Sequence, residues 1–314
     1  MTVDRYVCPR DKSRLYQEGA ELICSRCSTR YPLVGEVPIL IDDDNSVFSR
    51  ADYLGDRAYE GASYGTASDS AGGARAAVRK AALWLSEISV DLSSVNSHQA
   101  VEAMGKAHPD GQILVIGSGE AAFDHPRITY SDVALGSRTS CICDAHSLPF
   151  PDGTFAGVVA VAVLEHVADP NQCVSEIHRV LCGGGLVYAV TPFLQPVHMG
   201  AHDFTRFTYL GHRRLFRWFD DVESGCALGA ATSTAYVISG SLACISNAKW
   251  SLRLARLSGL FIAAFVKQFD RMIGRRLGAY DTAAAVFFFG RKRDTPITDK
   301  QLIRLYRGAQ VSRE

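Results

Sequence analysis

Apolar residues in the middle of the chain gather in short runs that end at glycine or at polar residues. Ile113–Ile116 is followed by glycines, Ile128–Asp132 ends in a carboxylate, and Gly157–Val163 is apolar throughout. Such runs are typical of strands that are buried on both faces of a parallel sheet. We therefore expect these stretches to be central strands, with a further strand over 183–190 after a helix over Val174–Leu181.

The C-terminal part of the chain changes pattern twice. Residues 250–278 interleave Leu and Phe with Arg and Lys, which is typical of a long basic amphipathic helix. Such a helix can cover a substrate pocket, form a homodimer or lie on an anionic membrane, and packing is the commoner outcome. Thr282–Arg291 is apolar again, and we expect it to be the last strand, returning antiparallel.

The segment before the central strands is irregular. Residues 66–74 are rich in Ser, Gly and Ala, which favours a connector, and Ala74–Ile88 has helical composition. Tyr59 and Tyr64 stand among glycine and serine. They can close over a bound cofactor as a lid, or they can equally fasten the N-terminal residues to the main domain.

Composition narrows the function classes. The 314 residues are 47% hydrophobic, and 33 basic residues balance 33 acidic ones, so nucleic acid is not expected as the main partner. The chain has no signal-peptide pattern and no run of eighteen uncharged apolar residues, so we expect a cytoplasmic protein. We divide it into an N-terminal module (1–45), a linker and helical cap (46–110), a main domain (111–292) with a helical insertion (250–278), and a tail (293–314).

Two pairs of metal-binding residues lie in the N-terminal module. Cys8 and Asp11 form the first pair, and Cys24 and Cys27 form the second. Ligands with this spacing can hold one ion from a single turn, and a carboxylate can replace a thiolate. We therefore expect a zinc site with three cysteines and one aspartate, and the alternative is a ribbon that survives on packing without metal.

The same module resembles a known small domain. Tyr31-Pro32 and the stretch Gly35–Ile41, which reads Gly-Glu-Val-Pro-Ile-Leu-Ile, follow the two ligand pairs. In this order the features are similar to the zinc ribbon of the Trm112-like family. The resemblance implies a small β zinc-ribbon-like module, of a kind found attached to methyltransferases or acting as their partner.

The glycines after the first central strand satisfy two templates. Gly117 and Gly119 with Ala122 match the dinucleotide fingerprint, in which backbone amides at a helix start face a pyrophosphate. The stretch also resembles motif I of the class I S-adenosylmethionine-dependent methyltransferases. Asp132 can accept the ribose hydroxyls of either cofactor, so it does not discriminate.

Residues further along the chain distinguish between the two cofactors. Asp144 opens a segment that continues to Leu148-Pro-Phe150, and Leu164-Glu-His-Val167 follows the next strand. Over about residues 110–220 this order is similar to the class I methyltransferases with a type 11 domain. The resemblance implies an α/β, Rossmann-like seven-stranded sheet with helices on both faces and S-adenosylmethionine as cofactor. It implies cofactor contacts from the residues Gly117, Ser118, Gly119, Asp132, Asp144, Ala145 and Val163, and Tyr59 and Tyr64 are the candidates for a lid.

Titratable residues follow two of the predicted strands on the acceptor side. The candidates are His198, His166, His202, Asp203 and Arg206. They are expected at the carboxyl edge of the sheet, where a base could remove a proton from a hydroxyl. The stretch Pro192–Phe219 resembles methyltransferases of glycan and secondary-metabolite pathways, which implies O-methylation of a small-molecule, sugar or lipid-linked hydroxyl. The alternatives are an RNA or protein methyltransferase whose ribbon recruits the substrate, a non-catalytic cofactor-binding adaptor and, more remotely, an NAD oxidoreductase.

Overall fold

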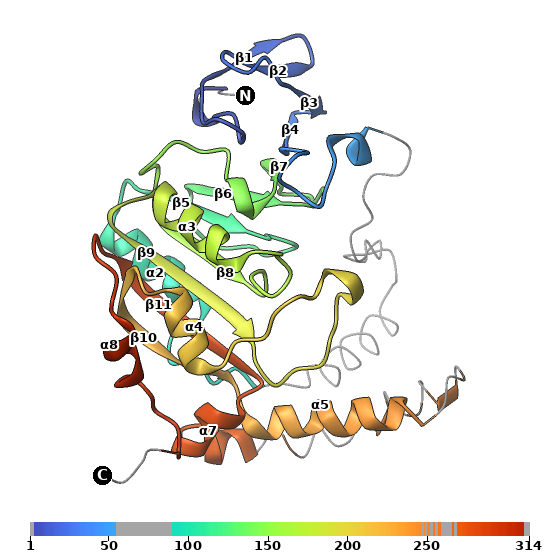
Figure 1. Cartoon of the computed structure of the whole chain (residues 1–314), viewed down its shortest axis with the longest axis vertical. Helices are drawn as coiled ribbons and strands as arrows, with labels where there is room; N and C mark the ends of the chain where they lie inside the picture. Colours follow the sequence, from blue (N-terminus) through green and yellow to red (C-terminus); the bar gives the residue numbers. More distant parts are fainter. Residues whose placement is uncertain are drawn as a thin grey trace.

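A computed structural model describes residues 3–54, 90–245 and 269–310, together with a few separate positions between 248 and 266. At its centre lies a large sheet (Figure 1). Seven of its strands follow the order β7-β6-β5-β8-β9-β11-β10. These strands are β5 (Gln112–Ile116), β6 (Ile128–Asp132), β7 (Cys141–Cys143), β8 (Phe155–Val161), β9 (Leu181–Pro192), β10 (Phe219–Leu228) and β11 (Ala285–Lys292).

The order of the seven strands is that of a Rossmann-like sheet. Neighbouring strands from β7 to β9 are parallel, whereas β11 runs antiparallel to both β9 and β10. Within these seven strands, the chain runs from β5 outward to β6 and β7 and then crosses back to β8 on the other side of β5. Open α/β sheets bind ligands beside the carboxyl ends of strands at such a change of direction. The expected strands and the antiparallel return of the last one are confirmed.

Helices cover both faces of this sheet, as the sequence predicted. Ile113 and Val115 of β5 pack in one core with α2, whereas Leu114 and Ile116 pack in another with α3, because successive strand residues point to opposite faces. The helix expected over 74–88 lies outside the described residues. The helices are α2 (Ser97–Ala107), α3 (Pro170–Val180), α4 (Tyr209–Leu215), α5 (Ala230–Ala243), α7 (Leu277–Thr282) and α8 (Asp299–Ile303).

The prediction of a helix directly after Gly119 was wrong. Ile116 ends β5 and Ile128 begins β6, and the chain between them forms only turns. Parallel strands are usually joined by a dozen or more residues when a helix lies between them, and this connection is shorter. Pro126, near its end, has no backbone N–H to continue a helical ladder. The glycine turn is therefore not backed by a helix N-terminus.

The N-terminal module extends the central sheet, so the prediction of seven strands plus a separate module needs correction. Its strands are β1 (Leu15–Glu18), β2 (Glu21–Cys24), β3 (Arg30–Val34) and β4 (Val37–Leu40). They pair antiparallel in sequence order, and β4 then pairs parallel with β7, placing Ile39 opposite Ile142 and Leu40 opposite Cys143. The result is one sheet of eleven strands. β4 covers an edge of β7 that would otherwise expose unpaired backbone groups.

The C-terminal segment is described in part. α5 ends at Ala243 and α7 begins at Leu277, and much of the helical insertion expected over 250–278 lies outside the described residues. Figure 1 shows α5 extending along one side of the molecule. Within the described part of the chain, no helix combines the length and apolar character needed to cross a bilayer.

Short 3-10 segments complete the fold. They are η1 (Val3–Arg5), η2 (Arg50–Tyr53), η3 (Ala145–Ser147) and η4 (Gly200–His202). Two of them flank the carboxyl edge of the sheet, because η3 follows β7 and η4 follows β9. Residues near these two turns line the cavity described next.

Candidate active site

A cavity opens beside the carboxyl ends of β5, β6 and β8, where the strand order predicts a ligand. It contains about 740 Å³ of unfilled space, including the part open to solvent. Five residues expected to bind the cofactor line it: Gly117, Asp132, Asp144, Ala145 and Val163.

The turn after β5 requires glycine for two reasons. Gly117 has φ +61° and Gly119 has φ +50°, a region that side chains other than glycine rarely adopt. A Cβ on Gly117 would lie 2.5 Å from Cγ2 of Val163, so the turn also approaches the following strand too closely for a side chain. Ser118 between them is buried, and its hydroxyl has no partner among the described residues.

Asp132 fixes this turn from the end of β6. Its Oδ2 accepts a hydrogen bond of 2.7 Å from the Gly119 amide, and its Oδ1 accepts one of 3.0 Å from the Ala134 amide. The carboxylate is buried and lies at the cavity wall. A carboxylate has about four acceptor positions, so it can still receive hydroxyl groups of a ligand.

Asp144, at the end of β7, is held from two sides. His146 donates to its Oδ1 from the backbone amide at 2.9 Å and from Nδ1 at 2.6 Å, while Ser46 donates to Oδ2 at 2.5 Å. His146 Nε2 accepts from the Asp169 amide, which leaves the ring proton on Nδ1. Burial opposes ionisation, but these hydrogen bonds outweigh it and lower the pKa of Asp144.

The bond to Ser46 brings the chain after β4 over the cavity. Val47 and Phe48 line it, and the Phe48 ring stacks on the ring of His202, with centroids 5.8 Å apart. The sequence predicted a lid from Tyr59 and Tyr64, which lie outside the described residues. Among the described residues, the segment that covers the cavity is therefore closer to the N-terminal module than expected.

Three side chains, of which His166 lines the cavity, converge beside it. Glu165 Oε1 lies 3.7 Å from His166 Nε2 and 3.9 Å from His198 Nε2. The Glu165 side chain is 1% exposed, and neither carboxylate oxygen has a hydrogen-bond partner among the described residues. Burial raises the pKa of Glu165 to about 7, although nearby Arg206 acts in the opposite direction. Burial also lowers the pKa of His166, whose Nδ1 lies 2.8 Å from the carbonyl oxygen of His202.

Asp203 and Arg206, predicted as catalytic candidates, are paired with each other. Arg206 donates two hydrogen bonds to the Asp203 carboxylate and others to the carbonyls of Gln195 and Pro196. The hydrogen bonds from Arg206 lower the pKa of Asp203 to about 2. Asp203 also accepts from the backbone amide of His198. The geometry gives this pair the role of holding the loop that carries His198.

Seven residues predicted from the sequence line the cavity, but sequence reasoning missed others. Glu165 was predicted as part of a motif and not as a site residue, although its position in the turn after β8 was a usable signal. Ser46 and Phe48 had no such signal, because their place over the cavity depends on the pairing of β4 with β7. His166 and His202 line the cavity as expected.

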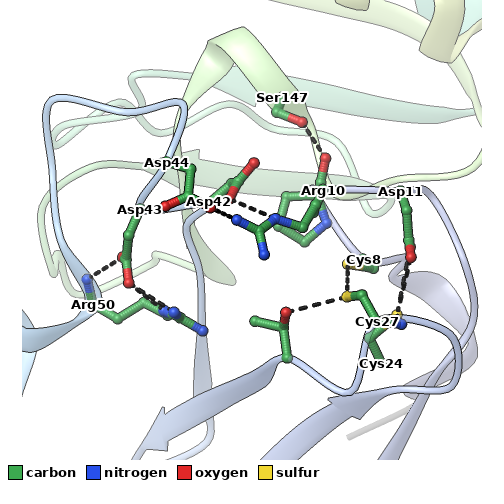
Figure 2. Close-up of polar contacts among 12 residues, drawn as sticks. Cys8, Arg10, Asp11, Cys24, Cys27, Asp42, Asp43, Asp44, Arg50 and Ser147 are labelled. Atoms are coloured by element: carbon green, nitrogen blue, oxygen red, sulfur yellow. Dashed lines mark hydrogen bonds and ion pairs between the residues drawn. The ribbon is translucent and has the colours of Figure 1, made fainter.

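The four predicted metal ligands of the N-terminal module also come together (Figure 2). One ligand atom from each of Cys8, Asp11, Cys24 and Cys27 lies within 4.8 Å of the others. Cys24 Sγ accepts hydrogen bonds of 3.4 Å from the amides of Arg26 and Cys27. Bonds of this kind stabilise a thiolate, so the donor set is chemically suited to zinc.

The two ligand pairs adopt the same backbone turn. The Lys12 amide donates to the Cys8 carbonyl, and the Ser28 amide donates to the Cys24 carbonyl. Lys12 and Ser28 have φ of +59° and +57°, respectively. Asp11 therefore occupies, in the first turn, the position that Cys27 occupies in the second.

Comparison with known proteins decides the class of the central domain. Residues 71–189 match the family model described as a methyltransferase domain. This part of the chain is similar to a methyltransferase domain. The match covers the glycine turn, Asp132, Asp144 and Glu165, and it confirms the predicted enzyme class, an S-adenosylmethionine-dependent methyltransferase, for this part of the chain.

Other similarities are more limited. An uncharacterised 37.1 kDa protein in transposon TN4556 of Streptomyces fradiae is 34% identical over 82 residues, which cover 24% of this chain and 22% of that protein. The chain thus spans about a fifth of the length of that relative. A complex of the Haloferax volcanii Trm112 methyltransferase activator with a methyltransferase is 16% identical, with a TM-score of 0.36, covering 63% of this chain and 91% of that one. The Haemonchus contortus phosphoethanolamine N-methyltransferase 2 is 16% identical, with a TM-score of 0.37, covering 63% and 54%.

The cavity of the methyltransferase domain suits S-adenosylmethionine chemically. Asp132 and Asp144 offer carboxylate acceptors for ribose hydroxyls and for the adenine amino group, and the unpartnered hydroxyl of Ser118 lies in the adjoining turn. Gly117 leaves backbone exposed at the cavity wall. The residues present therefore fit the cofactor that the family implies.

Proposed function

We propose that the chain transfers a methyl group from S-adenosylmethionine to a hydroxyl of a small-molecule, sugar or lipid-linked acceptor. The observation that carries this proposal is the convergence of Glu165 and His198 on His166, which lines the cofactor cavity. A thiol acceptor or a stabilised carbanion would need less help with proton removal. Hydroxyl groups are weak acids, so a cluster of this kind serves an oxygen acceptor best.

In the proposed reaction, the cofactor-binding residues and the cluster that contains His166 have separate roles. The cofactor supplies a methyl group on a sulfonium, and the electrons of the breaking C–S bond remain on sulfur as the acceptor oxygen forms the C–O bond. Asp132 and Asp144 orient the nucleoside, and the glycine turn admits the cofactor close to the backbone. The cluster opposite them, containing His166, draws the proton from the acceptor hydroxyl. In-line positioning contributes the remainder of the rate.

The acceptor can be sought directly. Fractions of cell extract incubated with purified protein and methyl-labelled S-adenosylmethionine should yield a labelled product whose mass exceeds that of the acceptor by one methylene unit. Incorporation should fall when Glu165→Gln replaces the wild type. Incorporation only into RNA or protein fractions would favour the macromolecular alternative, and cofactor binding without any transfer would favour an adaptor.

We further propose that Cys8, Asp11, Cys24 and Cys27 bind structural zinc. The proposal is supported by the matching turns of the two ligand pairs and by the closeness of the four ligand atoms. Metal analysis of purified protein should find zinc that is lost on Cys24→Ser. Equal zinc content in both proteins would contradict the assignment.

A peripheral membrane contact through 250–278 remains a proposal for the lipid-linked case. Trp250, Leu254, Leu257 and Met272 are exposed apolar residues of this segment, and arginines neighbour them in the sequence. Anionic vesicles should sediment the protein if this surface binds them, and neutral vesicles should not. Equal recovery with both vesicle types would exclude the contact.

A further inference from the structure

Three electron-pair donors face one another at the acceptor wall. Oε1 of Glu165 and Nε2 of His166 and of His198 all lie within 4.8 Å of each other. Glu165 is fully buried, and both its carboxylate oxygens are without a hydrogen-bond partner in the described part of the chain. A buried carboxylate without a hydrogen-bond partner is costly, and a bound cation would offset that cost.

Nδ1 of each histidine lies near an acceptor other than Glu165. His166 Nδ1 lies 2.8 Å from the carbonyl oxygen of His202, which can only accept, so Nδ1 carries the proton. His198 Nδ1 lies 3.4 Å from Oδ2 of Asp203, a carboxylate that is likewise an acceptor. His166 Nε2 therefore presents a lone pair to Glu165, and His198 Nε2 would do so in the same tautomer.

The separations are those of ligands around an ion. A proton shared between Glu165 and either histidine would draw the two atoms to roughly 2.6–3.2 Å, and the observed values are 3.7 and 3.9 Å. Ligands bound at about 2.1 Å in a tetrahedral arrangement lie about 3.4 Å apart. Small side-chain movements would bring the three atoms to that geometry.

We propose that Glu165, His166 and His198 bind a divalent transition-metal ion of the zinc type, distinct from the zinc of the N-terminal module. Two histidines and one carboxylate form the ligand set of open catalytic sites, which keep a position for water or substrate. The His202 carbonyl and the Asp203 carboxylate orient the two imidazoles, as outer partners of metal-bound histidines usually do.

The ion would also help to deprotonate the acceptor hydroxyl in the proposed methyl transfer. This part of the inference rests on the proposed function. His166 lies at the cavity wall, so the proposed site adjoins the cavity. A hydroxyl bound there has a lowered pKa and loses its proton near neutral pH. The substrate class that this favours is an acceptor whose reactive hydroxyl can approach a metal ion.

Cobalt binding to the full chain tests the site. Protein carrying Cys24→Ser, which removes a ligand of the N-terminal module, is stripped with a chelator and titrated with Co²⁺. We expect one Co²⁺ per chain, with visible absorption but without the near-ultraviolet band of thiolate ligation. Adding His198→Ala or Glu165→Gln should weaken binding by more than about tenfold, the size of effect known for loss of even an outer partner. His202→Ala, on the same loop, retains its backbone carbonyl and should bind Co²⁺ normally.

Two outcomes would overturn the proposal. In the first, the Cys24→Ser protein binds no stoichiometric Co²⁺, and the chain with all its cysteines binds a single ion whose affinity is unchanged by His198→Ala. The other is equal Co²⁺ affinity in His198→Ala and His202→Ala. Calorimetry with S-adenosylmethionine on the same samples separates this proposal from the proposed function. Cofactor binding without Co²⁺ binding would contradict the metal site but not the methyltransferase function. Co²⁺ binding without cofactor binding would contradict the methyltransferase function but not the metal site.

Discussion

At the scale of single residues, Asp144 links cofactor recognition to folding. Its folded pKa is lowered, so its contribution to stability is present above the unfolded value of about 3.9 and is lost as pH falls through the folded value. Asp144→Asn should therefore lower the free energy of unfolding at pH 7 by about 1.5–3 kcal/mol, the range for hydrogen bonds to a charged group. Urea unfolding should show this difference shrinking towards pH 3. A difference independent of pH would contradict the assignment.

His198 separates catalysis from cofactor binding. His198→Ala should reduce turnover by about 10²–10⁴-fold, the usual contribution of a group that handles a proton, while the dissociation constant for S-adenosylmethionine changes little. His98→Ala, an exposed histidine on α2, serves as the control and should leave turnover unchanged. Unaltered turnover in His198→Ala would remove this residue from the site.

Some of these residues could be predicted from sequence and others could not. Asp132 and Asp144 end predicted strands, and the ends of parallel strands meet at one edge of a sheet, so their positions followed from order alone. The importance of Glu165 depends on side-chain surroundings. Its backbone carbonyl accepts from Phe204 and Thr205, while its carboxylate has no hydrogen-bond partner among the described residues, and no spacing rule predicts that division.

At the scale of elements, the turn after β5 has a sharp steric requirement. Gly117→Ala would place a Cβ against Val163 in a backbone region that alanine rarely adopts, so it should destabilise the fold by about 1–3 kcal/mol and weaken cofactor binding. Gly183→Ala is the matched control, because nothing lies within 4 Å of its Cβ position and its φ is not positive. Thermal unfolding compares the two variants, and equal stability would contradict the steric account.

The elements also show the limits of pattern reading. Apolar runs located β5, β6 and β9 within a few residues, because buried parallel strands have a distinctive composition. The same pattern could not show that the connection from Ile116 to Ile128 is too short for a helix. It also could not show that β4 joins β7, since pairing between distant segments leaves no periodic signal in the sequence.

At the scale of the whole molecule, the N-terminal module is attached to the cofactor side of the methyltransferase domain. Lys12 Nζ donates to Ser147, to the Leu148 carbonyl and to Glu176, and Ser46 donates to Asp144. Disruption of the module should therefore weaken cofactor binding at the side of the cavity that contains Asp144. Two long-range polar connections and a continuous sheet carry the coupling.

Metal removal tests this connection. Chelation of the zinc proposed for the module should lower the melting temperature by several degrees, because metal binding contributes to folding, and should also weaken S-adenosylmethionine binding. Cys24→Ser should reproduce both effects, whereas His198→Ala should produce neither. A chelated protein with unchanged melting temperature and cofactor affinity would show that the module needs no metal.

The most direct measurement is a calorimetric titration of the full chain with S-adenosylmethionine. Our account predicts saturable binding of one cofactor per chain, and loss of that binding in Asp144→Ala, whose carboxylate lies at the cavity wall. Absence of binding by the folded wild-type protein would contradict the assignment of the cavity as a methyl-donor site.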